Sequence, residues 1–268
     1  MDGPVNFMDI RSVEFDELYA RLDDLMGRAV RGEPGISAFF SPRELRYAQM
    51  YLRAAGADFF SLGGYPDAER QRIVVLPEYM AGIDSADELK EYGYESGIAA
   101  IKAVGSGFES LSHRTFMGSL LGLGLKRSII GDIVMIADNE AVVFCECGIV
   151  EFLLTHWDKA GRDKIKLFVT DPDSVVIPPR KYSTLSDTVA SPRLDCIVAA
   201  LCSLSREKAK ETITSGAVEL EYECEERPDR EVCPPCVISV RGYGKFRVVS
   251  VSDKTKKGRY RLMAEKFL

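Results

Sequence analysis

The sequence predicts an α+β protein built from three small domains, and three observations support this prediction. Apolar residues recur at helical spacing in some segments and form short strand-like runs in others. Residues 98–170 follow the order strand, helix, strand, strand, helix, strand, which is typical of a ferredoxin-like (RRM-like) domain. A chain of 268 residues is long for one hydrophobic core and sufficient for two or three.

Residues 1–92 are predicted to form a small N-terminal α+β domain. Ser41 followed by Pro42 is typical of a helix N-cap with proline at the first helical position. Two short strands flank a segment rich in glycine and charged residues. The expected elements are helices over 15–29 and 42–55 and strands over 58–62 and 72–76.

Residues 93–170 are predicted to form the ferredoxin-like domain, a candidate RNA-binding domain, with Ser112 as an N-cap and Gly124 as a helix stop. Many RNA-recognition modules have this fold, but so do many enzymes and regulatory domains. The sequence lacks the run of aromatic residues that stacks bases in RNP-type modules. The expected elements are strands over 98–104, 133–137, 141–145 and 165–170 and helices over 112–123 and 149–157.

A polar stretch with several prolines, residues 171–185, is predicted to be a linker to a third domain over residues 186–268. Two short helices begin near Arg193 and Ser205 and are expected to pack their apolar faces together. Ser205 as N-cap would leave the N-terminus of the second helix free to receive a phosphate. Strands are expected over 217–222, 237–240 and 246–251.

Charge is distributed unevenly along a chain whose formal net charge is −6. Residues 186–268 hold 15 basic and 13 acidic side chains, and residues 237–268 hold nine Lys or Arg against Asp253 and Glu265. Such local asymmetry indicates a polyanionic partner more directly than the net charge does. The C-terminal end is therefore expected to contact phosphates.

Several classes of protein are disfavoured by the sequence. No apolar run approaches the ~20 residues that span a bilayer, and the N-terminus lacks the basic-then-apolar order of a signal peptide. Seven cysteines, an odd number spread through a long chain, do not resemble a disulfide framework. We expect a cytoplasmic protein that does not bind membranes and is a monomer.

The C-terminal residues RLD at 193–195, LSREKA at 204–209 and ISVRGYGKF at 238–246 resemble the S4-type RNA-binding domain. Together with TKKGR at 255–259 and SHRTFMGSLLGLGLKRSIIGDI at 112–133, they resemble the YlmH family of bacterial and plastid S4-domain proteins. The resemblance covers essentially the whole chain. It implies the three domains named above, the last being an S4-type RNA-binding domain of two helices plus strands. It also implies association with the large ribosomal subunit, contact with ribosomal RNA and peptidyl-tRNA, and a role in ribosome-associated quality control.

The sequence departs from the family pattern at three places. Glu221 stands where the family usually has Asn, and Pro235-Cys236 where it usually has Gly-Asp. Residues 219–231 hold six Glu and one Asp, and a carboxylate at 221 facing a phosphate would oppose RNA binding by this hairpin. Thr115 replaces a usual acidic residue after His113-Arg114, which weakens a special role for that trio.

The predicted RNA-binding surface consists of basic residues in two domains and one helix cap. Gly242 and Gly244 could let backbone N–H groups approach a phosphate or could only shape a turn, and both interpretations stay open. The predicted residues are Arg193, Ser205, Arg206, Lys208, Lys210, Arg241, Lys245, Lys256, Lys257 and Arg259, with Arg114, Lys126 and Arg127 in the middle domain.

No catalytic, metal or cofactor site is expected. His113 and His156 have no partner that spacing alone would place, and a lone histidine near a helix end is more often structural. Cys233 and Cys236 have CxxC spacing, but only Cys224 lies nearby, and a zinc ion needs four ligands.

The main hypothesis is a non-enzymatic RNA-binding protein that docks on ribosomal RNA and tRNA of the large subunit through residues 186–268. One alternative is an RNA-modifying enzyme, of the pseudouridine synthase or methyltransferase type, that uses the S4-type domain as an anchor. Such an enzyme needs a catalytic Asp in a dedicated loop or a glycine-rich cofactor loop, and we recognise neither in the sequence. A second alternative is an adaptor for cell-division or envelope proteins.

Overall fold

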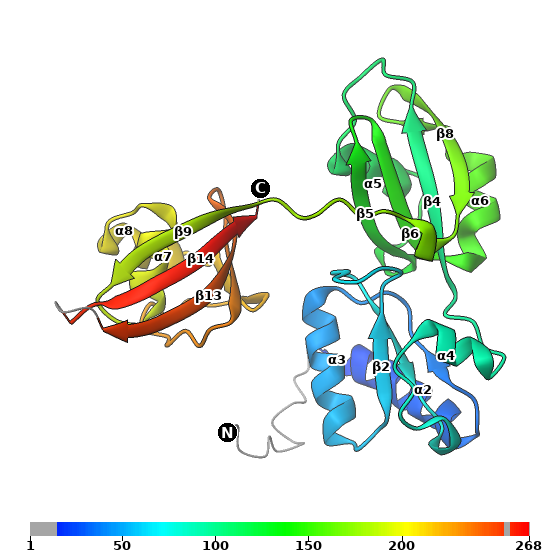
Figure 1. Ribbon diagram of the computed structural model, residues 1–268, viewed down its shortest axis with the longest axis horizontal. Helices are drawn as coiled ribbons and strands as arrows, with labels where there is room; N and C mark the ends of the chain where they lie inside the picture. Colours follow the sequence, from blue (N-terminus) through cyan, green and yellow to red (C-terminus); the bar gives the residue numbers. More distant parts are fainter. Residues whose placement is uncertain (1–14, 255–257, 268) are drawn as a thin grey trace. The chain divides into compact units, whose positions relative to one another are not determined.

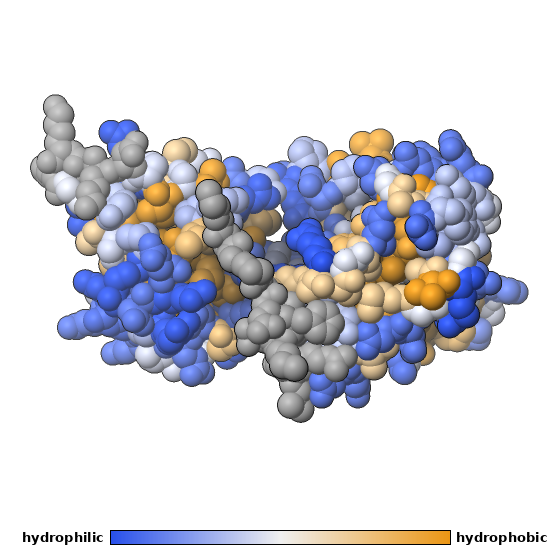
Figure 2. Space-filling view, turned by 90° about the horizontal axis from the view of Figure 1, so that it is seen from below, coloured by the Kyte–Doolittle hydropathy of each residue, from blue (hydrophilic) through white to orange (hydrophobic). Residues whose placement is uncertain are grey.

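The computed structural model describes residues 15–254 and 258–267 and confirms a mixed α+β fold. The chain forms two compact units, Met1–Pro178 and Pro179–Leu268 (Figure 1). The first unit contains both the N-terminal and the middle domain. Hydrophilic residues cover much of the face seen in Figure 2, with smaller apolar areas between them. No helix in the described part of the chain is long and apolar enough to cross a membrane.

The N-terminal domain packs its helices against a three-stranded antiparallel sheet of order β1-β3-β2. Ser41 caps α3 as predicted: its Oγ accepts from the Glu44 amide, and the Glu44 carboxylate accepts from the Ser41 amide at 2.8 Å. The short strand β1 and the helix α4 were not predicted. The elements are α2 (Asp16–Val30), β1 (Gly35–Ile36), α3 (Pro42–Ala54), β2 (Phe59–Leu62), β3 (Arg72–Val75), the 3₁₀ turn η2 (Glu78–Met80) and α4 (Ala86–Glu91).

The middle domain has an antiparallel sheet of order β5-β6-β4-β8-β7, in which the first four strands have the split βαβ order expected from the sequence. Helices α5 and α6 cover one face of this sheet around Phe116, Leu120, Leu153 and Trp157. The elements are β4 (Ile98–Gly105), α5 (His113–Gly122), η3 (Arg127–Ile129), β5 (Ile130–Ala137), β6 (Glu140–Glu146), η4 (Cys147–Ile149), α6 (Val150–His156), β7 (Lys159–Ala160) and β8 (Asp163–Thr170).

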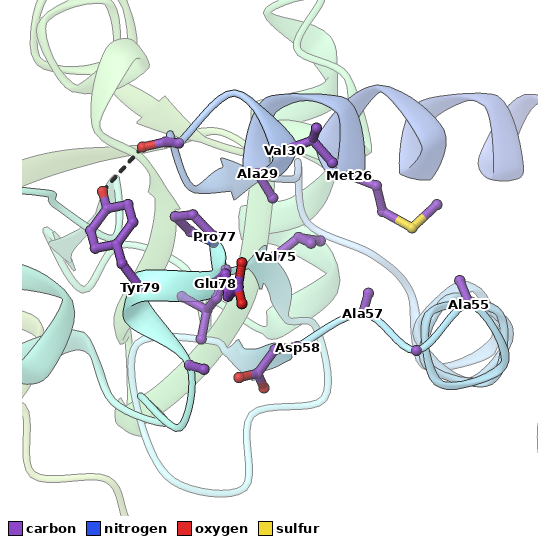
Figure 3. Close-up of a pocket in the computed structure, with 14 residues that line it drawn as sticks. Met26, Ala29, Val30, Ala55, Ala57, Asp58, Val75, Pro77, Glu78 and Tyr79 are labelled. Atoms are coloured by element: carbon purple, nitrogen blue, oxygen red, sulfur yellow. Dashed lines mark hydrogen bonds between the residues drawn. The ribbon is translucent and has the colours of Figure 1, made fainter.

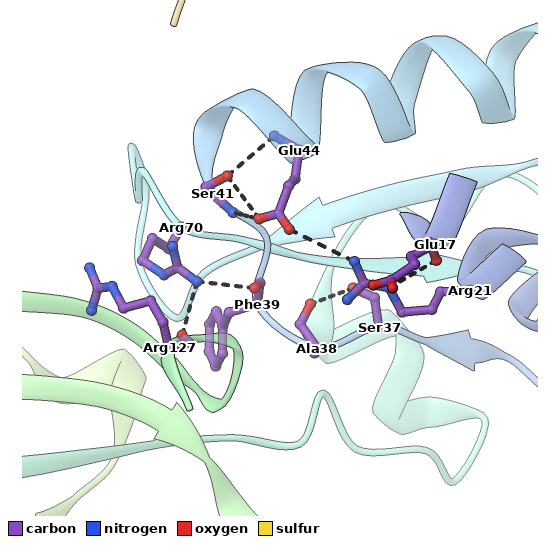
Figure 4. A network of polar contacts seen from close by, with 9 residues as sticks. All are labelled: Glu17, Arg21, Ser37, Ala38, Phe39, Ser41, Glu44, Arg70 and Arg127. Carbon is purple, nitrogen blue, oxygen red and sulfur yellow. Dashed lines mark hydrogen bonds and ion pairs between the residues drawn. The ribbon is translucent and has the colours of Figure 1, made fainter. Parts of the chain in front are cut away.

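Buried polar contacts join the N-terminal and middle domains. The guanidinium of Arg70 donates to the carbonyl oxygens of Phe39 and Arg127 (Figure 4) and also to that of Ile130, at 3.0 to 3.1 Å. The Asp132 carboxylate accepts from the Tyr65 hydroxyl and from the backbone amide of Arg70. Because a buried guanidinium is costly unless its donors are satisfied, these contacts fix the two domains to each other.

The C-terminal unit is a six-stranded antiparallel sheet of order β11-β10-β12-β13-β14-β9, with two helices on one face. Its core includes Leu194, Ile197, Ile213, Ile238 and Phe246. The two helices are those predicted from the apolar spacing. The elements are β9 (Tyr182–Val189), α7 (Leu194–Cys202), α8 (Arg206–Thr214), β10 (Val218–Leu220), β11 (Glu223–Cys224), β12 (Cys236–Val240), β13 (Gly244–Lys254) and β14 (Tyr260–Phe267).

The prediction of a linker over 171–185 is wrong at both ends. Val175 and Ile177, which follow the 3₁₀ turn η5 (Pro172–Ser174), pack against the apolar sheet face of the middle domain. Residues 182–185 begin β9, an edge strand that pairs with β14 along its whole length. The strand is rich in Ser and Thr because much of it stays exposed, and this composition is what made it resemble a linker.

Candidate nucleic-acid interface

A buried carboxylate organises the corner between α7 and α8. Asp195 is 0% exposed, and its two oxygens accept from Arg193 at 3.2 Å and from Arg206 at 3.0 Å. Burial alone would raise the pKa of Asp195, but the hydrogen bonds from the two arginines outweigh it and hold the pKa below its ordinary value. Arg193 and Arg206 therefore support the fold of the corner as well as presenting positive charge.

The start of α8 is capped as predicted. Ser205 Oγ accepts from the Lys208 amide at 3.2 Å. The Lys208 ammonium pairs with Glu211 at 2.9 Å on the exposed helix surface, and such a pair contributes little stability. Lys210 is exposed and makes no ion pair with any described residue. The N-terminal half of α8 thus presents Lys208 and Lys210 to solvent.

Two of the predicted arginines, far apart in sequence, line one hollow of about 510 Å³. Arg206 comes from α8, and Arg259 lies just before β14 and donates to the side chain of Thr188 at 2.9 Å. Asp187 also lines this hollow. Arg206 and Arg259 therefore face the same hollow from two segments that lie far apart in the sequence.

The sheet face opposite the helices carries cations held among aromatic rings. Phe246 is in the core, so Lys245 and Arg247 project to the other face. Lys245 lies 5.0 Å from the ring centre of Tyr222, and Arg247 lies 5.1 Å from that of Tyr182. Sequence reasoning missed Arg247, although its spacing of two residues from Lys245 places both on one face of a strand.

The structure places two of the residues that depart from the family pattern, Glu221 and Cys236. Glu221 sits at a hairpin tip with φ of 53°, and its carboxylate accepts a hydrogen bond from the Val237 amide. This bond holds the carboxylate on the neighbouring strand. Burial raises the pKa of the Cys236 thiol to about 12, whereas Cys233 is exposed. Within the described residues no group of three or more His, Cys, Asp or Glu could hold a metal ion.

The middle-domain candidates divide into two kinds. Arg114 and Lys126 are exposed, on α5 and just before η3. Arg127 is half-buried beside Met117, and burial together with the nearby Arg70 lowers the pKa of its guanidinium to about 10. Arg127 therefore lies at the interface of the N-terminal and middle domains, where its carbonyl oxygen accepts from Arg70, and is only partly exposed. Burial, followed by the charge of Arg127, also lowers the pKa of His113.

The remaining predicted residues lie outside these groups. Arg241 follows β12 and lines a small hollow of about 270 Å³ with Gly244 and Ser239. Lys256 and Lys257 lie outside the described residues.

A larger hollow of about 930 Å³ lies in the N-terminal domain and was not predicted (Figure 3). Its lining is mainly apolar, with Met26, Val30 and Val75, and Tyr79 at one side donates to the Gly32 carbonyl at 3.1 Å. The charged side chains that line it are those of Asp58 and Glu78, so this hollow does not suit a polyanion.

Family models and known proteins resemble this chain along most of its length. Residues 15–80 match the model described as "YlmH, N-terminal", and residues 90–173 match "Putative RNA-binding domain in YlmH". The "Ribosome-associated protein quality control protein P2" of Bacillus subtilis (strain 168) is 29% identical over 231 residues, which are 86% of each chain.

A solved structure shows a related fold. The "Cell division protein ylmH from Streptococcus pneumoniae" superposes with a TM-score of 0.50 at 17% identity, over 60% of this chain and 93% of that one. The two family models together match more than half of the 268 residues, in two separate domains. The chain therefore belongs to the YlmH family.

Proposed function

We propose that the protein binds RNA on the ribosome through its C-terminal unit, docking on ribosomal RNA of the large subunit and on the tRNA held there. It holds these RNAs without modifying them and acts in the cytoplasm, in quality control of stalled nascent chains. The observation that carries the proposal is the corner where Arg206 and Arg259 line one hollow beside the capped start of α8. The name of the Bacillus relative supports the ribosomal setting.

The charge of the two units favours this assignment. Residues 179–268 hold 17 basic and 13 acidic side chains, a net of +4. Residues 1–178 hold the remaining 18 basic and 28 acidic, a net of −10. An acidic body limits nonspecific adsorption to nucleic acid, while the basic unit supplies contacts to phosphates.

The chemistry of the corner favours recognition of shape over sequence. Its charged groups are guanidinium and ammonium donors, which pair with phosphate oxygens. A folded RNA helix hides its base edges in a deep, narrow groove and displays its backbone. Contacts from this corner therefore position the protein on a structured RNA.

Sedimentation with purified large ribosomal subunits tests the proposal. We compare the wild-type chain with a variant in which Lys210→Gln and Arg259→Gln remove charge but leave both partners of Asp195 in place. Arg53→Gln with Lys90→Gln, two exposed basic residues of the N-terminal domain, is the matched control. Wild type and control are expected to pellet with the subunit and the C-terminal variant to pellet several-fold less. Equal pelleting of all three proteins would refute the assignment of this surface.

A second assay tests the non-enzymatic part of the proposal. Ribosomal RNA is incubated with the protein, with and without S-adenosylmethionine, and its nucleosides are measured by mass spectrometry. We expect no new methylated nucleoside and no new pseudouridine. A nucleoside modified in proportion to enzyme concentration would favour the RNA-modifying alternative.

A further inference from the structure

The sheet face of the middle domain that lies opposite α5 and α6 is divided into a covered and an uncovered half. In the covered half, Phe144 of β6 is fully buried and packs on Tyr65 of the N-terminal domain, with ring centres 5.0 Å apart. Phe39 covers the same cluster, and Val175 and Ile177 pack against it. This half of the sheet is therefore unavailable to a nucleic acid.

The uncovered half is formed by β8, β7 and the adjoining part of β4. Phe168 lies opposite Lys102 in the antiparallel register and is 52% exposed. Lys166 and Lys164 alternate with buried or half-buried residues on β8, so they share the face of Phe168. Lys159 of β7 lies directly opposite Lys164. One exposed aromatic ring thus lies opposite one lysine and at the end of a row of lysines along β8, in a unit of net charge −10.

The pairing of these lysines is unfavourable without a ligand. Like charges directly opposite on neighbouring strands destabilise a sheet, and Lys159 faces Lys164 in this way. Neither of them, nor Lys166, makes an ion pair with a residue in the described ranges. Lys102 is different, because it pairs with Glu140 at 2.7 Å at the border of the covered half. A polyanion lying along β8 would relieve the repulsion.

We propose that this surface, Phe168 with Lys159, Lys164 and Lys166, is a second RNA-binding site, specific for single-stranded RNA. We call it the Phe168 strip. The inference rests on the proposed function only in taking the protein to be an RNA-binding protein. It places a separate site in the first unit, distinct from the basic corner of the C-terminal unit.

The residues of the strip favour a single strand over a duplex. An aromatic ring on a sheet binds a base by stacking on its flat face, and the bases of a duplex are already stacked on each other. Lysines along the strand provide phosphate contacts that do not depend on sequence. With one exposed ring, the strip stacks one base and is expected to tolerate any sequence.

Fluorescence anisotropy with a labelled octauridylate, measured on the full-length chain at low salt, tests the site. Phe168→Ala is expected to weaken binding about tenfold, because the ring is the group on which a base stacks. Lys164→Gln with Lys166→Gln is expected to lower the slope of log affinity against log salt by about 1.4 in magnitude, since each phosphate contact on a single strand contributes about 0.7.

The control is Phe152→Ala, an exposed aromatic residue of α6 on the opposite side of the sheet. It is expected to bind the octauridylate as the wild type does, and thermal melting verifies that all variants are folded. Lysines near a sheet edge can also serve only to prevent pairing with other chains. Affinities of Phe168→Ala and the lysine variant within twofold of wild type would support that alternative and overturn the inference.

The same measurements separate the inference from the proposed function. The Lys210→Gln and Arg259→Gln variant is expected to keep its octauridylate affinity while losing the large subunit. If the Lys210→Gln and Arg259→Gln variant binds the octauridylate more weakly and Phe168→Ala binds it as the wild type does, the single strand binds to the C-terminal unit. The inference is then wrong. If Phe168→Ala loses the octauridylate but the C-terminal variant still pellets with subunits, the strip stands and the proposed docking surface fails.

Discussion

At the scale of single residues, Asp195 contributes to the response of the C-terminal unit to acid. Its pKa is lowered in the folded state, so the stability it contributes is present above its unfolded pKa and is lost as pH falls through the folded value. We expect Asp195→Asn to lower the free energy of unfolding at neutral pH by ~1–3 kcal/mol. The difference from wild type should begin to shrink below about pH 4, where the carboxyl of the unfolded chain becomes protonated, and should fall further as the pH approaches the lowered pKa of the folded state.

Urea titrations of both proteins between about pH 3 and pH 7 measure this effect. Glu219→Gln, an exposed carboxylate on β10, is the control and should change stability little at any pH. If wild type and Asp195→Asn differ by the same free energy of unfolding at every pH in this range, the arginines do not stabilise the ionised form of Asp195.

We expect Arg206 to have a structural role, through its contact with Asp195, as well as the proposed role in RNA binding, and a single substitution cannot separate the two. Arg206→Ala removes one of the two arginines on a buried carboxylate, so we expect a lower melting temperature as well as weaker RNA binding. In an Asp195→Asn background the buried charge is absent, and Arg206→Ala should then weaken binding with a smaller loss of stability. Melting curves and RNA titrations of the four proteins measure the coupling. Equal melting shifts in both backgrounds would show that Arg206 does not stabilise Asp195.

At the scale of elements, local signals were predictable and long-range pairings were not. Ser41, Ser112 and Ser205 each predicted a helix start, and each accepts a backbone hydrogen bond as an N-cap. The strand β9 was missed because its composition is polar, and only its pairing with β14 makes it a strand. Likewise, the sequence predicted that Arg193 and Arg206 present charge, but burial of Asp195 beneath them depends on how the two helices pack.

The pairing of β9 with β14 leads to a prediction about fragments. Val189 of β9 is in the C-terminal core, and the strand satisfies the backbone groups at the edge of β14. A fragment of residues 179–268 should therefore unfold cooperatively on heating, as measured by circular dichroism. A fragment of residues 190–268, which lacks the strand, should melt at a lower temperature or lack a cooperative transition. Equal melting temperatures for the two fragments would show that β9 is dispensable.

At the scale of the whole molecule, two units of opposite net charge make RNA binding depend strongly on salt. Neutralising about five phosphates predicts a slope of log affinity against log salt of roughly −3.5 to −4.5 for a structured ribosomal RNA. The acidic unit is remote from these contacts in sequence. Its charge should therefore affect the affinity for nonspecific RNA and leave the salt slope for ribosomal RNA unchanged. We therefore expect a variant with Asp87, Glu88 and Glu91 of α4 changed to Asn or Gln to bind nonspecific RNA more tightly. Its slope for the ribosomal RNA should stay close to that of the wild type.

Titrations of fluorescent ribosomal RNA at several potassium chloride concentrations measure both quantities, with an unrelated RNA of equal length as the nonspecific competitor. Arg53→Gln with Lys90→Gln serves as the comparison of opposite sign, because it makes the acidic unit more negative by two charges and should weaken nonspecific binding. A slope near zero in the wild type would exclude phosphate contacts as the main source of affinity. If the α4 variant and the Arg53→Gln, Lys90→Gln variant change the slope for ribosomal RNA equally, the acidic unit contacts that RNA. The assignment of these phosphate contacts to the C-terminal unit alone would then be wrong.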